Sequence, residues 1–255
     1  MKSLSLALLA VALPLMAQDE TFRWQGSIAA GGRLEIRGVN GNVKAEPSTG
    51  ALAEVTAVKS GRKSDPRQVE IKVVEDGDGV TICAVYPSRD AARPNECKPG
   101  GGRNNTSNND VRVEFTVRVP SGVRFLGNTV NGGIEAAGLN GDIELHTVNG
   151  RIKASTMGCA EAKTVNGGIE ATVGRTDCAR PMEFTTVNGG VTLGLPASTN
   201  AELNVETVNG GIDSDLPLTL RGKISNKRLT ATLGSGGREI RVKTVNGGVN
   251  LRKTS

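Results

Sequence analysis

The 255-residue sequence predicts an all-β protein, a β-solenoid of about seven coils of roughly 20 residues each. Two observations carry this prediction: the tetrapeptide Thr-Val-Asn-Gly occurs six times between residues 129 and 247, and apolar and polar residues alternate between its copies. A third is the composition, with 34 glycines but only one tryptophan, one tyrosine and four phenylalanines. Such a composition suits a narrow core of Val, Ile, Leu and Ala.

The repeated tetrapeptide sets the period of the predicted coils. Its asparagines are separated by 18, 17, 22, 21 and 37 residues, and a degraded copy at Ser225-Asn226-Lys227 divides the last gap into 17 and 20. A second family of breaks, rich in Gly and Pro, falls between these turns. Each repeat should therefore contain two turns and two short strands. The turn asparagines are Asn131, Asn149, Asn166, Asn188, Asn209 and Asn246.

The segments on either side of each turn alternate with the period of a β-strand. After the turns they read as Ile134-Glu135-Ala136 does, and before the turns as Ile143-Glu144-Leu145 does. Apolar residues at every second position predict strands with one face in a core. The abundant β-branched residues and glycines disfavour a helix.

Two folds are compatible with this alternation. Asn-Gly between strands is a hairpin signal, so an antiparallel β-meander is the alternative. The solenoid is favoured because stacked coils place identical residues about 4.8 Å apart, and asparagine amides hydrogen-bond along such a ladder. Asn tolerates and Gly prefers the left-handed conformation of a sharp bend. A buried asparagine would also satisfy backbone groups at the corner.

Four cysteines and the first residues predict an exported protein. Residues 1–17 have the layout of a secretory signal peptide, and their apolar run is shorter than the roughly 20 residues of a membrane span. We therefore expect no transmembrane segment in the mature chain. Spacing favours the disulfides Cys83–Cys97 and Cys159–Cys178, the second pair one coil apart.

Residues 18–126 are predicted to form a strand-rich β region before the repeat solenoid of residues 127–255. Gly38-Val39-Asn40-Gly41 resembles the later turns, which indicates an early coil or a cap that continues into the solenoid. Residues 88–109 are expected to form a mobile polar loop that Cys97 partly pins. The strand at Leu251-Arg252-Lys253 should end the stack, with charges that discourage further stacking.

We expect no catalytic residue, cofactor site or metal site. The single histidine, His146, follows Glu144 on the same strand face and is predicted to be exposed. Residues 76–79, Asp-Gly-Asp-Gly, fit a hairpin turn better than a calcium loop.

The net charge of +5 is dispersed, which excludes a nucleic-acid face. Two outward columns are expected to form cross-strand surface pairs: Glu135, Lys153 and Glu170, and Glu144, Glu161 and Glu183.

The leader, the alternating first half, the Val119-Pro120 step and the Thr-Val-Asn-Gly-Gly-Ile units resemble the bacterial putative-adhesin domain family, an exported β-repeat domain of unknown function. The resemblance spans roughly residues 22–252 and implies no catalytic residues. We hypothesise a periplasmic or cell-surface adhesion, scaffold or interaction module of the envelope. Its partner would be a cell-surface glycan, an envelope component or another protein. The alternatives are an envelope-stress sensor that binds peptides or lipids, and a carbohydrate-active β-helix enzyme.

Overall fold

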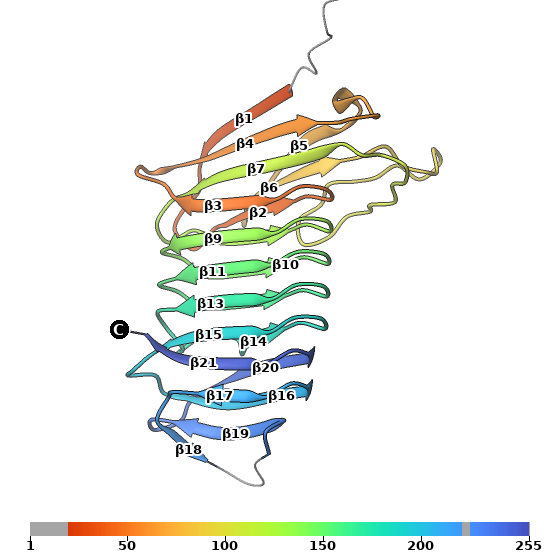
Figure 1. The fold of residues 1–255 in the computed structure, drawn as a ribbon. Helices are drawn as coiled ribbons and strands as arrows, with labels where there is room; N and C mark the ends of the chain where they lie inside the picture. The colour runs from red at the N-terminus through yellow and green to blue at the C-terminus, as the bar shows by residue number, and fades with distance from the viewer. Residues whose placement is uncertain (1–19, 221–224, 255) are drawn as a thin grey trace, which may run out of the picture.

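The computed structural model describes residues 20–220 and 225–254, so the predicted signal peptide at residues 1–17 lies outside the described residues. Two long sheets pack face to face and form an elongated stack of coils (Figure 1). The predicted all-β solenoid is confirmed. Among the described residues, no helix is both long enough and apolar enough to cross a membrane.

Both sheets run through the whole described part of the chain. Sheet A has ten strands there, in spatial order β1 (Glu20–Ser27), β4 (Leu52–Ser60), β7 (Arg112–Val119), β3 (Val43–Pro47), β9 (Ile134–Leu139), β11 (Ile152–Thr156), β13 (Ile169–Val173), β15 (Val191–Pro196), β21 (Val249–Thr254) and β17 (Ile212–Ser214). Sheet B has eleven, in the order β18 (Leu218–Leu220), β19 (Arg228–Leu233), β16 (Ala201–Asn209), β20 (Arg238–Asn246), β14 (Met182–Thr185), β12 (Ala160–Lys163), β10 (Ile143–His146), β8 (Arg124–Asn128), β2 (Arg33–Arg37), β6 (Gly79–Val85) and β5 (Glu70–Asp76). A short 3-10 helix, η1 (Pro66–Gln68), precedes β5.

Consecutive coils in the middle of the stack pair in parallel and in register. Ile152 of β11 lies opposite Ile134 of β9 on one side and Ile169 of β13 on the other. These side chains are buried and face the core between the sheets. Parallel pairing excludes the antiparallel meander for these coils. Because the sheets share one narrow layer of aliphatic side chains, a large aromatic core is not needed.

The asparagine corners form a continuous ladder. Each Asn Nδ2 donates to the Oδ1 of the next, at 2.7–2.9 Å, in the spatial order Asn209, Asn246, Asn188, Asn166, Asn149, Asn131 and Asn40. Six of these are the predicted ladder residues, and Asn40 shows that residues 38–41 form the predicted early coil. The expectation of buried asparagines is wrong: all but the half-buried Asn40 are exposed, and the side chains bond to one another.

The threonine of the tetrapeptide supplies the bond to the backbone that the asparagine does not make. Its hydroxyl is buried and donates to a glycine carbonyl of the neighbouring coil at 2.7–3.1 Å. The pairs are Thr129–Gly41, Thr147–Gly132, Thr164–Gly150, Thr186–Gly167, Thr207–Gly247 and Thr244–Gly189. At each corner, Thr therefore bonds to the backbone of the neighbouring coil, and Asn bonds to the side chain of the neighbouring Asn.

The order of coils at the C-terminal end differs from the order in the sequence. Strands β20 and β21 insert between the coil of β14 and β15 and the coil of β16 and β17. The expected stack-ending strand at residues 251–253 is therefore interior, because β21 pairs with both β15 and β17. The degraded copy at 225–227 is not a parallel coil: it turns the chain into β19, which pairs antiparallel with β16.

The N-terminal end shows the same inversion. The coil of β2 and β3 lies between β6 and β7 on one side and β8 and β9 on the other. Antiparallel strands β1, β4 and β5 lie beyond it and end the two sheets. Residues 76–79 form the predicted hairpin turn, between β5 and β6.

Candidate functional site: the outward face of sheet B

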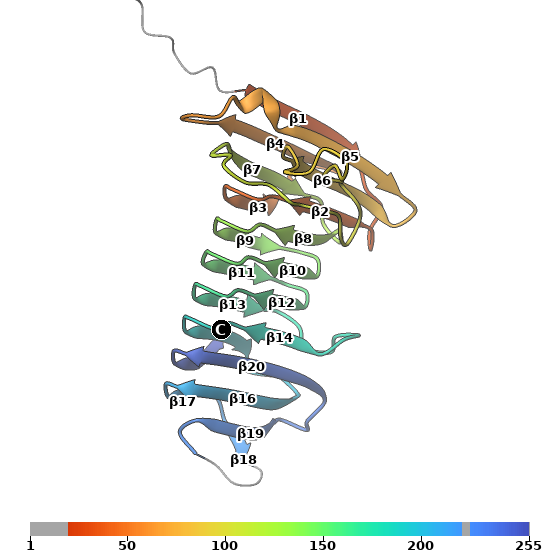
Figure 2. The same cartoon turned by 90° about the vertical axis from the view of Figure 1, so that its right-hand side faces the viewer.

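Two loops, each tied by a disulfide, flank the outward face of sheet B. The loop of residues 86–111 joins β6 to β7, and Cys97 in it bonds to Cys83 of β6. The loop of residues 174–181 precedes β14 and projects from the side of the stack (Figure 2). Its Cys178 bonds to Cys159, which lies just before β12. These are the two cysteine pairs that the spacing predicts, and they hold both loops close to the sheet.

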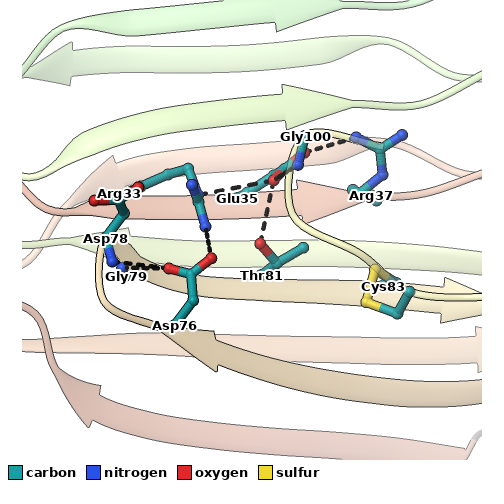
Figure 3. A network of polar contacts seen from close by, with 10 residues as sticks. Arg33, Glu35, Arg37, Asp76, Asp78, Gly79, Thr81, Cys83 and Gly100 are labelled. Carbon is teal, nitrogen blue, oxygen red and sulfur yellow. Dashed lines mark hydrogen bonds and ion pairs between the residues drawn. A yellow bond between two sulfur atoms is a disulfide. The ribbon is translucent and has the colours of Figure 1, made fainter. Parts of the chain in front are cut away.

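A buried carboxylate anchors the first loop. Glu35 of β2 faces outward from the core but is fully covered, and it accepts hydrogen bonds from the Gly100 backbone N–H at 2.9 Å and from the Thr81 hydroxyl at 3.1 Å (Figure 3). Arg37 pairs with its other oxygen at 2.6 Å. Burying a carboxylate is costly unless it is paired and hydrogen-bonded, and both conditions hold here. Glu35 therefore positions the loop rather than reacting.

Beside this network, the hydrogen bonds of the Asp76 carboxylate stabilise the turn between β5 and β6. Asp76 accepts from the backbone N–H groups of Asp78 and Gly79, and Arg33 donates to its second oxygen at 2.6 Å (Figure 3). The Arg33 bond, followed by the backbone bonds, lowers the pKa of Asp76 below its usual value. All of these contacts are internal, which supports the reading of this segment as a hairpin.

The first loop encloses a cavity of about 270 Å³ with the asparagine corners of two coils. Loop residues Asn95, Glu96 and Arg103 face Asn128 at the end of β8 and His146 at the end of β10. The Tyr86 ring lies at the base, and its hydroxyl donates to the Val111 carbonyl at 2.8 Å. Burial raises the pKa of Tyr86 to about 12. The cavity is therefore lined by amide, guanidinium and imidazole groups over a rigid floor.

The second loop encloses a smaller cavity of about 150 Å³ at the other ends of the same strands. Arg180 of the loop faces Arg124 of β8, Glu144 of β10 and Glu161 of β12. We call the outward face of β2, β8, β10 and β12, with these two cavities, the sheet B groove. It is a shallow polar surface between two tethered loops.

A cluster of three side chains lies between the two cavities, with His146 lining the first and Glu144 and Glu161 lining the second. Glu144 and His146 alternate with buried residues on β10, and Glu161 lies opposite Glu144 on β12. His146 Nε2 is 3.5 Å from Glu161 Oε1, and His146 Nδ1 is 3.9 Å from Glu144 Oε1. Each of the three residues has one possible metal-ligand atom, an imidazole nitrogen or a carboxylate oxygen, that lies within 4.8 Å of the ligand atoms of the other two. The prediction of an exposed His146 is wrong: its side chain is 33% exposed and lines the groove.

Basic side chains already contact the acidic members of this cluster. Lys163 lies opposite His146, and its Nζ is 2.7 Å from both Glu161 and Glu183; Arg180 is 3.4 Å from Glu144. Burial lowers the pKa of Lys163, but the hydrogen bonds to the two glutamates outweigh this effect and raise it above its usual value. The Lys163 hydrogen bond lowers the pKa of Glu183.

The structure separates the two outward columns that the sequence predicts. Glu144, Glu161 and Glu183 line sheet B near His146, whereas Glu135, Lys153 and Glu170 lie in register on the outward face of sheet A. The repeat alone does not distinguish the columns. What distinguishes them is the pair of cysteine-tethered loops, whose sequences carry no repeat and whose path over sheet B only the fold shows.

Comparison with known proteins finds one family model that matches part of the chain and solved structures with a similar fold. Residues 128–252 match the model of the family described as Toastrack DUF4097. A solved structure described as a putative cell adhesion protein from Clostridium sporogenes ATCC 15579 is 12% identical, with a TM-score of 0.50 over 93% of this chain and 100% of that chain. A putative adhesin from Bacteroides fragilis NCTC 9343 is 10% identical, with a TM-score of 0.38 over 92% of this chain and 97% of that chain. No curated protein matches the chain.

Proposed function

Because residues 128–252 match the model of the Toastrack DUF4097 family, we propose that the protein is an exported, non-enzymatic interaction module of the cell envelope. The family confirms the predicted putative-adhesin domain and is one of unknown function. The structural relative from Clostridium sporogenes is described as a putative cell adhesion protein, which supports an adhesive or scaffolding role. The two disulfides support export to the periplasm or the cell surface.

The observation that carries the proposal is the sheet B groove between two disulfide-tethered loops. A stack of hydrogen-bonded coils is a rigid support, and each disulfide limits the movement of one loop over it. Preformed surfaces bind partners with less loss of conformational entropy than flexible ones. The groove is therefore suited to recognition.

The lining of the groove favours a hydroxyl-rich partner. Asn104, Asn128 and Arg103 line the larger cavity and offer both donors and acceptors, whereas Asn95 already bonds to the loop backbone and Glu96 pairs with Lys98. Such groups pair with sugar hydroxyls, whereas an acyl chain would leave them unsatisfied. A cell-surface or matrix glycan is the partner class that this chemistry fits best.

The acidic residues of the groove support a non-enzymatic role. A glycosidase uses two carboxyl groups, one as an acid and the other as a base or nucleophile. Here Glu144 contacts Arg180, and Glu161 contacts Lys163, so both carboxylates have basic partners. These contacts are typical of cross-strand surface pairs rather than of a general acid and its base.

Adherence of a deletion strain tests the proposal directly. Complementation with wild-type protein should restore binding to glycan-coated surfaces, and R103E/R180E, which reverses charge in both cavities, should not. The matched control is K153E, which reverses charge on the outward face of sheet A. Equal adherence of the groove variant and the wild type would reject the groove as the contact surface. Purified proteins on the same surfaces separate direct binding from indirect effects.

A further inference from the structure

We propose that Glu144, His146 and Glu161 form a binding site for a divalent first-row transition metal ion, with Zn²⁺ as the expected occupant. Imidazole nitrogen and carboxylate oxygen are the ligand types that Zn²⁺ takes in proteins, and three protein ligands leave a position open for water or a partner. The proposal stands independently of the adhesive role, because metal binding is measured on the isolated protein.

The separations between the ligand atoms suit such an ion. Tetrahedral Zn²⁺ with bonds of about 2.0–2.2 Å holds its ligand atoms about 3.4 Å apart. His146 Nε2 and Glu161 Oε1 are 3.5 Å apart, which is close to that value. One possible ligand atom from each of the three residues lies within 4.8 Å of the other two. Glu144 Oε1 is 3.9 Å from Nδ1 of the imidazole, so the Glu144 side chain must turn toward Nε2 to share an ion with Glu161.

The histidine nitrogen that faces Glu161 is available for a ligand. His146 Nε2 is shielded from solvent by the surrounding side chains and makes no hydrogen bond among the described residues. A shielded nitrogen without a partner loses free energy relative to water, and coordination would recover it. This orphaned atom distinguishes the cluster from ordinary acidic surface pairs.

Charged side chains of both signs surround the cluster. Lys163 contacts Glu161 and Glu183, Arg180 contacts Glu144, and Arg124 lines the same cavity. Lys163 Nζ is 2.7 Å from the Glu161 oxygen that a metal ion would take. We infer that Lys163 occupies this position in the metal-free protein and moves toward Glu183 when the ion binds.

The strands hold the three ligands in place with little reorganisation. Glu144 and His146 are two residues apart on β10, and β10 pairs in parallel register with β12. The Cys159–Cys178 bridge fixes the start of β12 beside the loop that carries Arg180. A site on paired strands is more precise than one on a loop.

The test is a titration of untagged, chelator-treated protein with ZnCl₂ at pH 7.5, followed by calorimetry. We expect one ion per chain, and H146A should weaken binding more than tenfold. E170Q, which removes an exposed carboxylate from sheet A, should bind as the wild type does. Co²⁺ should give a visible absorption band typical of four-coordinate nitrogen and oxygen ligands, and H146A should abolish it.

Substitution of Lys163 should change the affinity for Zn²⁺ in the opposite direction. Because K163M removes the competing cation, it should bind Zn²⁺ more tightly than the wild type, which no loss of folding would produce. Circular dichroism of each metal-free variant checks that the fold is retained. Absence of one-to-one binding in the wild type, or binding that H146A leaves unchanged, would overturn the proposal.

Discussion

The centre of the stack and its two ends build the same sheets in different ways. From β8 to β15, each coil follows its neighbour in the sequence and pairs with it in parallel. At each end, one coil is inserted out of order. Antiparallel strands lie beyond it in both sheets at the N-terminal end and in sheet B at the C-terminal end, where sheet A ends in the parallel strand β17. Coils with the same sequence can therefore stack on one another in order, and a different arrangement of strands ends the stack.

The chemistry of the two kinds of region differs accordingly. The central coils depend on close backbone contacts and on ladders of identical side chains. The N-terminal end depends on a covalently tethered loop, the buried Glu35 carboxylate and the buried Tyr86 hydroxyl. An open solenoid edge exposes unpaired backbone groups to other chains, and antiparallel strands cover the parallel coils in both sheets at the N-terminal end and in sheet B at the C-terminal end.

The first glycine of a corner should be the most sensitive position. A Cβ on Gly167, the first glycine of a central corner, would meet the Gly150 carbonyl of the next coil, and a Cβ on Gly210, the equivalent glycine of the outer coil, would meet the Gly247 carbonyl. A Cβ on Gly211, the second glycine of the outer corner, would meet nothing within 4 Å. We expect G167A and G210A each to lower the free energy of unfolding by about 4 kcal/mol and G211A by less than about 1 kcal/mol. Denaturant unfolding measures all three. A much smaller loss for G210A than for G167A would show that the outer coil moves to admit the methyl group and the centre does not.

Removing each disulfide in turn compares the stability of the centre with that of the N-terminal end. Removing Cys159–Cys178 as a serine pair should cost about 3 kcal/mol, chiefly through the unfolded state. Removing Cys83–Cys97 should cost nearly as much, since the enclosed separations are 19 and 14 residues. Chain entropy alone predicts a difference of about 0.3 kcal/mol. A much larger loss for the Cys83–Cys97 pair would mean that the first loop also contributes native contacts that the bridge maintains.

Alkaline pH should weaken the N-terminal end selectively. The pKa of Tyr86 is raised to about 12 by burial, so the folded state keeps its proton when the unfolded state has lost it. The contribution of the protonated Tyr86 side chain to the free energy of unfolding is therefore complete below about pH 10. It disappears as the pH rises toward 12, and the loss in free energy of unfolding is on the order of 2 kcal/mol. Unfolding of the wild type and Y86F between pH 9 and 11.5 measures it. The same pH dependence in both proteins would contradict this assignment.

Substitutions in the asparagine ladder should give the smallest difference in the free energy of unfolding between the centre and the end. Asn166 donates to Asn149 and accepts from Asn188, whereas Asn209, at the outer end, donates to Asn246. We expect N166A to cost about 1.5 kcal/mol and N209A about half as much, since the ladder is exposed and water replaces part of each bond. Thermal unfolding of both variants gives the comparison. If N209A proves as costly as N166A, the ladder does not act through its side-chain bonds.

Much of the fold follows from local patterns in the sequence. Alternation sets which residues of a strand face the core, and the recurring Thr-Val-Asn-Gly sets the corner, the ladder and the register. The spacing of Cys159 and Cys178, one coil apart, is enough to predict their bond. The buried threonine hydroxyls could also have been predicted, because Thr recurs as strictly as Asn at the corner.

The order of the outer coils and the sheet B groove were decided by the tertiary structure. Parallel strands of one repeat are nearly equivalent as hydrogen-bonding partners, so the sequence does not specify that β20 and β21 insert before β16 and β17. That choice depends on the path of the whole chain. The proximity of Glu144, His146 and Glu161 likewise depends on which coils are neighbours, and the half-buried state of His146 on which loops cover the sheet. Local composition determines each residue's face, and only the assembled sheets determine its surroundings.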